Sequence, residues 1–260
     1  MKAVAAQRRR FGYRRTGVML ERKGMIMIHK KLYRFDTEEK LGVRRRRGRK
    51  RARGSRPPMP QALRPGELWS LDFLSDTFRA SRRFRILAIN DDCCSENLCL
   101  IADTSISGAC VARDLDALVR AYGRPASIVS GNGTEFTSRA ILKWANENGV
   151  DWNYIDPCMP MPNAFIESFN NSLRDELLNE EMFDGLEDAR RKLALWRYDY
   201  NNVRPHLSPG NQTPAEARRT LELNEGSAPG ALAQTEEYEN QTGRLLLRMR
   251  EPRGPGHLSS

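Results

Sequence analysis

The segment SIVSGNGTEF, residues 127–136, joins a short apolar run to a glycine-rich loop. Ile128 and Val129 are β-branched, so the first half of the segment predicts a strand. Gly131 and Gly133 allow the loop backbone angles that other residues avoid. A loop at the end of a buried strand is where an α/β protein displays its working side chains. The segment therefore predicts an α/β fold, although the loop contains no acidic residue before Glu135.

Three strand patterns precede this segment and a fourth follows it. The first three are LWSLDFLS (68–75), FRILAIND (84–91) and NLCLIAD (97–103), and short polar turns join them as in a meander. VDWNYID (150–156) predicts the strand that follows. With SIVS these segments predict five strands.

Helical patterns alternate with the later strands. SGACVARDLDALVRAYG (107–123) places apolar residues on one face and ends at Gly123. TSRAILKWANENG (137–149) predicts a helix capped by Thr137, and two more helices are predicted at 163–179 and 186–202. Three antiparallel strands followed by alternating helices and strands predict a mixed five-stranded sheet with flanking helices, the order of a ribonuclease-H-like fold.

The positive charge of the chain is concentrated in one segment. The net charge is +10, and residues 44–56, RRRRGRKRARGSR, hold nine basic residues and no acid. Without these nine charges the net charge falls to +1. Such a run attracts a polyanion, and we expect it to bind DNA, although a solvated linker or a localisation or heparin-type signal has the same composition. The side chains that we expect to contact DNA are Arg44, Arg45, Arg46, Arg47, Arg49, Lys50, Arg51 and Arg53.

Composition divides the chain into four parts. Residues 1–42 are basic and predicted helical, and a helix-turn-helix remnant is one interpretation of them. Residues 43–66 form a basic, proline-containing linker, and residues 67–221 carry the strand and helix patterns of the core. Residues 222–260 are polar and glycine-rich, which predicts a loose C-terminal tail.

Several classes of protein are not favoured. The five cysteines form no Cys-x-x-Cys pair and only three histidines accompany them, so a zinc site is not predicted. A reducing cytoplasmic compartment is the simplest interpretation. No apolar run approaches the roughly 20 residues of a membrane span, and the N-terminus lacks the apolar centre of a signal peptide.

Two acidic residues stand out by position. Strand alternation places Asp72 on a face with Ser70 and Leu74, inside an otherwise apolar run. Glu167 lies early in a predicted helix, in a row with Asn163, Asn170 and Arg174, beside a buried stripe of Ile166, Phe169, Leu173 and Leu177. Taken singly, Asp72 reads as a sheet-face aspartate and Glu167 as a favourable charge near a helix N-terminus.

Together, four segments resemble the integrase core of bacterial insertion-sequence transposases. They are WSLDF, SGNGTEFTS, NAFIESFNNSLRDELLN and YNNVRPHLSPGNQTPAEA, and the resemblance to the second-frame product of these elements covers about residues 11–219. These enzymes are related to retroviral integrases. The resemblance implies a ribonuclease-H-like catalytic core, preceded by a small helical segment, with a catalytic Asp, Asp, Glu triad.

The triad is incomplete in this chain. By the resemblance, the first Asp is Asp72 and the Glu is Glu167, while the second Asp position is Gly131. The interval is intact, since 35 residues separate 131 from 167. The family uses Mg²⁺ (or Mn²⁺), and hard cations require carboxylate oxygens, so we expect metal binding by Asp72 and Glu167 to be weakened. Glu135 and Asp92 are the nearby acids that could replace the missing ligand.

The resemblance also implies a DNA-binding set and its losses. The surviving polar residues are Asn132, Asn163, Asn170, Arg174, Arg204 and His206, of which the first four are our candidates for DNA contact. Met159 stands where the family commonly has Lys, and Pro162 where it has Gln. The Gly-Arg that usually follows Phe-Asn is Asn171-Ser172 here.

The sequence leaves three functions open. The first is an insertion-sequence transposase, built for metal-dependent cleavage and strand transfer in DNA integration but impaired at Gly131. The second is a catalytically inactive DNA-binding relic or inhibitor, and the third is a nuclease of the same fold, which the VRPH…TPAEA segment disfavours. The resemblance implies as partners the terminal inverted repeats, target DNA, further copies of the chain on DNA and the first-frame product. It implies a bacterial, nucleoid-associated location and no membrane partner.

Overall fold

The structure is a computed structural model, and it describes residues 1–42, 62–155, 164–206 and 210–224. The basic run 44–56 and most of the predicted tail lie outside these ranges. So do three residues of the sequence predictions, namely Met159, Pro162 and Asn163. Within the described part of the chain, no helix has the length and apolar character needed to cross a membrane.

A mixed five-stranded sheet forms the centre of the molecule, as predicted, in the order β3-β2-β1-β4-β5. Its antiparallel half comprises β1 (Leu68–Thr77), β2 (Arg83–Asp91) and β3 (Asn97–Asp103). Its parallel half adds β4 (Ser127–Ser130) beside β1, and then β5 (Asp151–Tyr154). The parallel pairing of β1 and β4 sets Ser130 beside Leu71, so the loop that follows Ser130 leaves the sheet beside the middle of β1.

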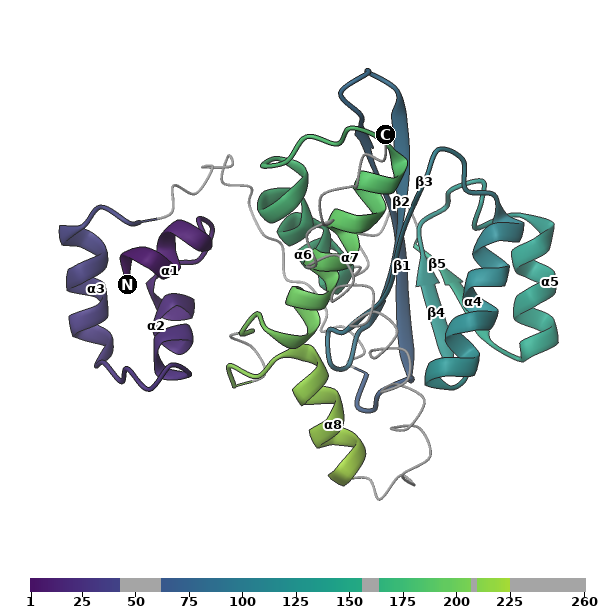
Figure 1. Ribbon diagram of the computed structural model, residues 1–260. Coiled ribbons are helices and arrows are strands. Elements are labelled where there is room, and N and C mark those ends of the chain that lie inside the picture. Colours follow the sequence, from purple (N-terminus) through teal and green to yellow (C-terminus); the bar gives the residue numbers. More distant parts are fainter. Residues whose placement is uncertain (43–61, 156–163, 207–209, 225–260) are drawn as a thin grey trace, which may run out of the picture.

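Helices cover both faces of the sheet (Figure 1). One face carries α4 (Gly108–Tyr122) and α5 (Arg139–Asn148), which pack on the side of Trp69 and Leu71. The other carries α6 (Ala164–Leu173), a π-helical turn η1 (Arg174–Leu178) and α7 (Leu186–Asn202), which pack on the side of Leu74. The four residues of the predicted α6 stripe, Ile166, Phe169, Leu173 and Leu177, are all buried.

The helix ends confirm one predicted boundary and correct another. The α4 helix begins at Ser107, whose Oγ accepts the Cys110 N–H at 3.3 Å, and ends at Gly123 with φ 86°. The predicted cap of α5 is wrong. Ser138 is the residue at its N-terminus, while the Thr137 hydroxyl donates to the Gly133 carbonyl at 3.3 Å. The predicted helix 163–179 also changes character, because η1 replaces α-helical geometry after Leu173.

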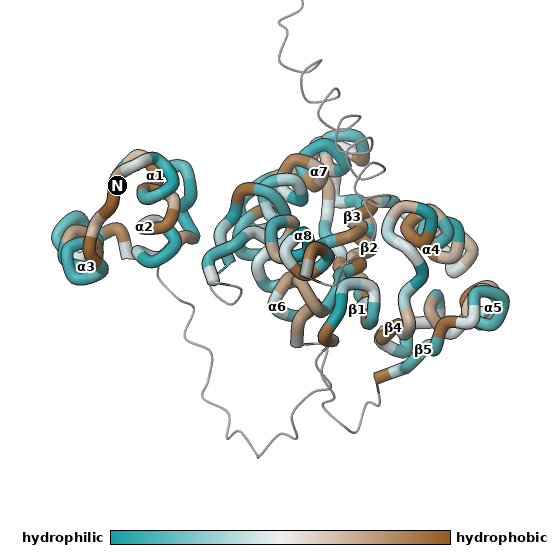
Figure 2. Tube along the Cα trace, turned by 90° about the horizontal axis from the view of Figure 1, so that it is seen from below, coloured by the Kyte–Doolittle hydropathy of each residue, from teal (hydrophilic) through white to brown (hydrophobic). Residues whose placement is uncertain are grey.

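Residues 1–42 form three short helices, α1 (Lys2–Gln7), α2 (Tyr13–Glu21) and α3 (His29–Glu38), which we call the N-terminal module. They share a small apolar cluster of Val4, Leu20 and Leu32. On α3, Leu32 is buried, whereas the neighbouring Tyr33 is 59% exposed. Figure 2 shows the module set to one side of the helices that cover the sheet.

The last described helix, α8 (Pro214–Asn224), starts with a reciprocal cap. The Thr213 hydroxyl accepts the Glu216 N–H at 3.2 Å, and the Glu216 carboxylate accepts the Thr213 N–H at 2.7 Å. The helix continues three residues past the predicted end of the core at 221. Its Arg218 contacts Glu96 at 3.3 Å, at the turn between β2 and β3, which fastens the helix to the sheet.

Candidate functional site

The candidate site lies where β1, β4 and α6 meet. Asp72 follows Leu71 on β1, and Gly131 follows Ser130 on β4, so register alone makes Asp72 and Gly131 neighbours at one edge of the strands. Strand alternation directs Asp72 to the face that α6 covers. The loop after β4, which begins at Gly131, therefore lies beside Asp72, the first acidic residue of β1.

Asp72 is held in a half-buried position by two hydrogen bonds. Its carboxylate accepts the Asn170 amide at 2.6 Å and the backbone N–H of Phe73 at 2.8 Å. Burial raises the pKa of Asp72, and these two hydrogen bonds oppose the rise. The charge of Glu167 raises this pKa further and that of Arg174 lowers it. The structure therefore brings Asp72, Glu167, Asn170 and Arg174 into one electrostatic neighbourhood.

Gly131 leaves room beside Asp72. Among the described residues, apart from its two chain neighbours, no atom would lie within 4 Å of a Cβ built on this residue. Its φ also lies outside the left-handed region that favours glycine. Neither backbone strain nor crowding therefore requires glycine at this position.

The Glu135 carboxylate is paired with an arginine on a neighbouring strand. Its carboxylate forms an ion pair with Arg85, whose guanidinium stacks over the Phe73 ring at 4.1 Å. The hydrogen bond from Arg85 lowers the pKa of Glu135. Phe73 packs on the α4–α5 side of the sheet, and Asp72 points to the opposite side. This arrangement does not favour Glu135 as a substitute for the missing acid.

Asp92 lies at the other end of β1. Its backbone N–H donates to the Leu68 carbonyl at 3.0 Å, and its carboxylate accepts the Ser70 hydroxyl. Ser70 lies on the same face of β1 as Asp72, two residues away, so the Asp92 carboxylate lies roughly 7 Å along the strand from Asp72. Burial raises the pKa of Asp92 to about 7, with Ser70 opposing the shift and Asp91 adding to it. The hydrogen bond with Ser70 and the raised pKa, and not distance, disfavour Asp92 as a replacement metal ligand.

The remaining candidates differ in exposure. Asn132 is exposed, and its amide donates to the Ile155 carbonyl at 2.5 Å, which ties the loop after β4 to the end of β5. Arg174 is exposed at the start of η1. Asn170 is 8% exposed, and its Oδ1 is buried with no hydrogen-bond partner among the described residues. Asn170 thus faces Asp72, whereas Asn132 and Arg174 face outward.

Arg204 and His206 are buried and make contacts that stabilise the fold. Arg204 is 3% exposed, donates to Glu176 at 2.6 Å and stacks over Tyr200 at 5.1 Å. His206 contacts the Tyr200 carbonyl at 3.2 Å, and burial lowers the pKa of its imidazole to about 3. Arg204 thus links the segment after α7 to η1, while His206 packs back on α7 at Tyr200.

The donor set does not fit a two-ion magnesium site. Such a site requires carboxylates on both ions, and Asp72 and Glu167 are the two acids near the position of Gly131. Among the described residues, no group of three or more His, Cys, Asp or Glu is arranged to hold a metal ion. The buried, unpartnered Oδ1 of Asn170 adds one hard oxygen nearby but no charge.

Sequence reasoning missed the partners of these acids. Asn170 lies three residues after Glu167, one helical turn on, so helix periodicity could have paired it with Asp72. The Arg85–Glu135 pair had no local signal, because it depends on the register that sets Arg85 opposite Ser75. The pairing of Glu176 with Arg204 likewise joins residues that are 28 positions apart.

Family comparisons match most of the core. The integrase core domain matches residues 62–160 and, in a second form, residues 148–214. An insertion element IS407 uncharacterized 31.7 kDa protein of Burkholderia multivorans is 43% identical over 213 residues, which is 82% of this chain and 77% of that protein. An insertion element IS476 uncharacterized 39.2 kDa protein of Xanthomonas euvesicatoria is 42% identical over the same share of this chain and 62% of that protein.

The fold is also found among solved structures. A chain of the simian T-cell lymphotropic virus intasome, solved in complex with PP2A regulatory subunit B56 gamma, matches with a TM-score of 0.52 at 14% identity. That match covers 65% of this chain and 59% of the viral chain, and it bears on the fold alone. The sheet order, the family match and the identity to insertion-element proteins agree. The chain belongs to the integrase core family, in the branch of insertion-element transposases related to retroviral integrases.

Proposed function

We propose that this protein is an insertion-element transposase that binds DNA ends and was built for phosphodiester cleavage and strand transfer, with a site impaired at Gly131. The observation that carries the proposal is the open space at Gly131, beside Asp72, at the position where the family has its second acid. The site retains an oriented Asp72, a neighbouring Glu167 and an outward-facing Arg174.

The missing carboxylate matters because of charge. Cleavage of a phosphodiester develops negative charge on the attacking and leaving oxygens, and paired divalent cations neutralise it in two-metal enzymes. Two carboxylates provide too little negative charge to hold such a pair of ions firmly. This chain's own residues retain the capacity to orient Asp72 through Asn170 and to offer a guanidinium to a phosphate through Arg174.

DNA is the proposed partner. The basic run 44–56 supplies a dense positive charge, and Arg174 and Asn132 lie exposed beside the candidate site. The proposed DNA partners are the terminal repeats and target of the element. Further copies of the chain and the first-frame product of the element are proposed protein partners.

A second candidate function is a non-catalytic DNA-binding protein that inhibits active copies by assembling with them. The Glu135–Arg85 pair favours it, because this acid is already neutralised and oriented away from Asp72. Both functions use the same DNA-binding surfaces. They differ in whether the site catalyses DNA cleavage and strand transfer.

Restoring the acid separates the two functions. We expect Gly131→Asp to fold, to gain a thermal shift with Mg²⁺ or Mn²⁺, and to recover some cleavage of a pre-nicked terminal DNA. Gly131→Asn is the matched control, since it adds the same volume without the charge. Adding Met159→Lys and Pro162→Gln should raise activity further.

Two outcomes bear directly on the proposal. A Gly131→Asp chain that binds metal but cuts no DNA supports the inhibitor function. Robust strand transfer by the unaltered chain, abolished by Glu135→Ala, contradicts the impairment, because it shows that Glu135 replaces the absent ligand.

A further inference from the structure

The N-terminal module contacts the core through arginines. Arg8 pairs with Asp199 of α7, with one contact at 2.5 Å, and Arg10 pairs with Glu180 at 2.5 Å. Three longer ion pairs accompany them: Arg9 with Glu180 at 4.0 Å, Arg15 with Glu176 at 3.8 Å, and Arg22 with Glu216 at 3.5 Å. We call Glu176, Glu180, Asp199 and Glu216 the acidic face.

Apolar packing contributes little to this contact. The apolar cluster of the module, Val4, Leu20 and Leu32, is separate from the two clusters that pack on the sheet. Phe11 is buried, and the guanidiniums of Arg8 and Arg15 stack on its ring at 5.7 and 5.6 Å. Charge therefore makes a large contribution to the attachment of the module. The Arg10–Glu180 pair is exposed and individually weak, whereas the Arg8–Asp199 pair is part-buried.

The charges across this contact do not balance. Five arginines of the module meet four carboxylates, and Glu176 also accepts a hydrogen bond from Arg204. The Nε atoms of Arg15 and Arg204 are buried without hydrogen-bond partners among the described residues. Burial and the charge of Arg204 both lower the pKa of Arg15. The contact thus retains an excess of positive charge that a further anion would relieve.

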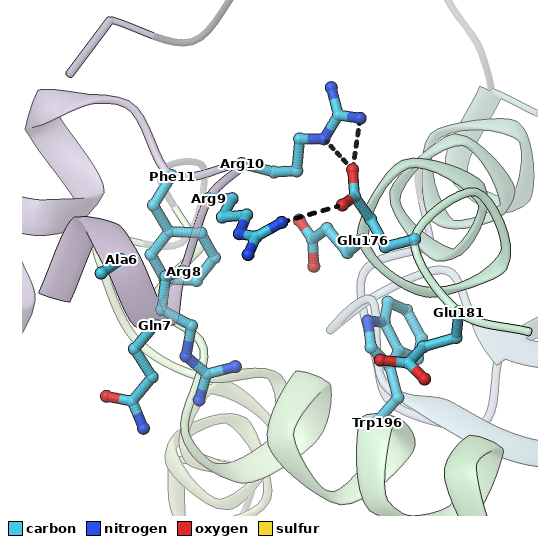
Figure 3. Close-up of a pocket in the computed structure, with 10 residues that line it drawn as sticks. Ala6, Gln7, Arg8, Arg9, Arg10, Phe11, Glu176, Glu181 and Trp196 are labelled. Atoms are coloured by element: carbon cyan, nitrogen blue, oxygen red, sulfur yellow. Dashed lines mark hydrogen bonds and ion pairs between the residues drawn. The ribbon is translucent and has the colours of Figure 1, made fainter. Parts of the chain in front are cut away.

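A pocket opens at the same place. Its volume is about 420 Å³, and Arg8, Arg9 and Arg10 line it on one side (Figure 3). Glu176, Glu181 and Trp196 line the other side. Space for a competing anion therefore lies directly between the arginines and the acidic face.

We propose that the acidic face occupies, within the same chain, an arginine surface of the module that binds DNA phosphates, so that DNA must displace the acidic face to engage the module. The inference rests on the proposed function, because it takes DNA as the ligand. A guanidinium binds carboxylate and phosphate with the same forked geometry, which makes the two anions direct competitors. Duplex DNA offers about one phosphate per 1.7 Å and releases counterions on binding, so it is the stronger competitor at low salt.

Removing carboxylates of the acidic face should strengthen DNA binding if they compete with DNA for the arginines. In the variant Glu180→Gln, Asp199→Asn, Glu216→Gln the module loses its competitor, and we expect a short duplex to bind about threefold to tenfold more tightly. The matched control is Glu147→Gln, Asp175→Asn, Glu187→Gln, which removes the same charge at exposed carboxylates without a partner in the module. Fluorescence anisotropy at two salt concentrations measures both variants against the unaltered full chain. Equal or weaker DNA binding by the first variant, relative to the control, overturns the inference.

A second measurement does not depend on DNA. Energy transfer between fluorophores introduced at Ala3 of α1 and Leu195 of α7, both exposed, reports on the attachment of the module. We expect inorganic polyphosphate to lower the energy transfer in the unaltered chain. The first variant should show low energy transfer before any polyphosphate is added. Transfer that polyphosphate leaves unchanged overturns the inference. A chain that opens with polyphosphate but binds no DNA overturns the proposed function and leaves an anion-gated contact standing.

Discussion

Asn170 shows how one side chain prepares the candidate site. Its amide donates to Asp72 at 2.6 Å, and this hydrogen bond favours the ionised carboxylate against the effect of burial. Its position one turn after Glu167 places the two functional groups of α6 beside the same strand residue. Asn170 is therefore proposed as a positioning residue for Asp72, whether or not the site turns over.

We expect Asn170→Ala to raise the pKa of Asp72 further, because the substitution removes a hydrogen bond that favours the ionised carboxylate. Carboxyl NMR titration of the labelled protein measures this shift. Asn171→Ala is the matched control, since it removes the same amide from the next, exposed position. The same titration curve in both variants would show that Asn170 does not stabilise the Asp72 carboxylate.

The burial of Asp92 should make the stability of the fold depend on pH. Burial raises its pKa from the ordinary 3.8 to about 7, so the folded chain holds a proton that the unfolded chain releases between these values. The stabilising contribution is therefore complete below pH 4 and is lost as the pH rises to 7. Relative to Asp92→Asn, we expect the unaltered chain to lose about 2–4 kcal/mol of unfolding free energy across this window.

Urea denaturation at several pH values measures this difference. The exposed Asp151→Asn serves as the control, because it changes the same group where water solvates it. Parallel stability curves for Asp92→Asn and the unaltered chain would contradict the prediction.

At the scale of elements, η1 connects the candidate-site helix α6 to the segment that follows α7. It continues α6 directly after the candidate residues and carries Glu176, which accepts a hydrogen bond from Arg204 beyond the end of α7. Short π-helical segments occur frequently at functional sites, where they shift the register of the residues that follow. In this chain the shift presents Glu176 to Arg204, whose guanidinium is otherwise buried.

We expect Glu176→Gln to destabilise the fold by about 3 kcal/mol, because it leaves the charge of Arg204 buried without compensation. Chemical denaturation measures the loss. The adjacent, exposed Asp175→Asn is the control and should change stability by less than about 0.5 kcal/mol. An equal effect in both variants would show that the Arg204 pair contributes nothing specific.

At the scale of the whole molecule, charge is distributed unevenly between the parts. The run 44–56 holds nine basic residues, while the remaining residues sum to +1. The run connects the N-terminal module to the core, so DNA bound to it would lie within reach of both. Long-range attraction of DNA should therefore depend on this run more than on the surface of the core.

Replacing residues 44–56 by a neutral Gly/Ser segment of equal length should flatten the log–log dependence of DNA affinity on salt by several units, since each neutralised phosphate contributes about 0.9. Equal length keeps the connection between module and core, so the change isolates charge. Anisotropy titrations between 50 and 200 mM salt measure the slope, a range in which roughly 6–10 phosphate contacts have a large effect. An unchanged slope would place the DNA contacts elsewhere.

The sequence by itself determined the elements of the core. Strand and helix periodicity predicted all five strands and the helices from α4 to α7, because side-chain alternation and the 3.6-residue repeat are local properties that burial enforces. The family resemblance, and not periodicity, assigned Asp72, Gly131 and Glu167 to one site, and that assignment stays a prediction. Local patterns failed at the α5 cap, where Ser138 and not Thr137 begins the helix, and at η1.

Only the tertiary structure decided what these residues contact. The pairing of β1 with β2 brought Arg85 to Glu135, and the packing of α6 on β1 brought Asn170 to Asp72. The arginines of the N-terminal module meet carboxylates about 170–190 positions away in sequence. Such contacts depend on register and on helix packing, which join distant segments, and no local pattern of residues encodes them.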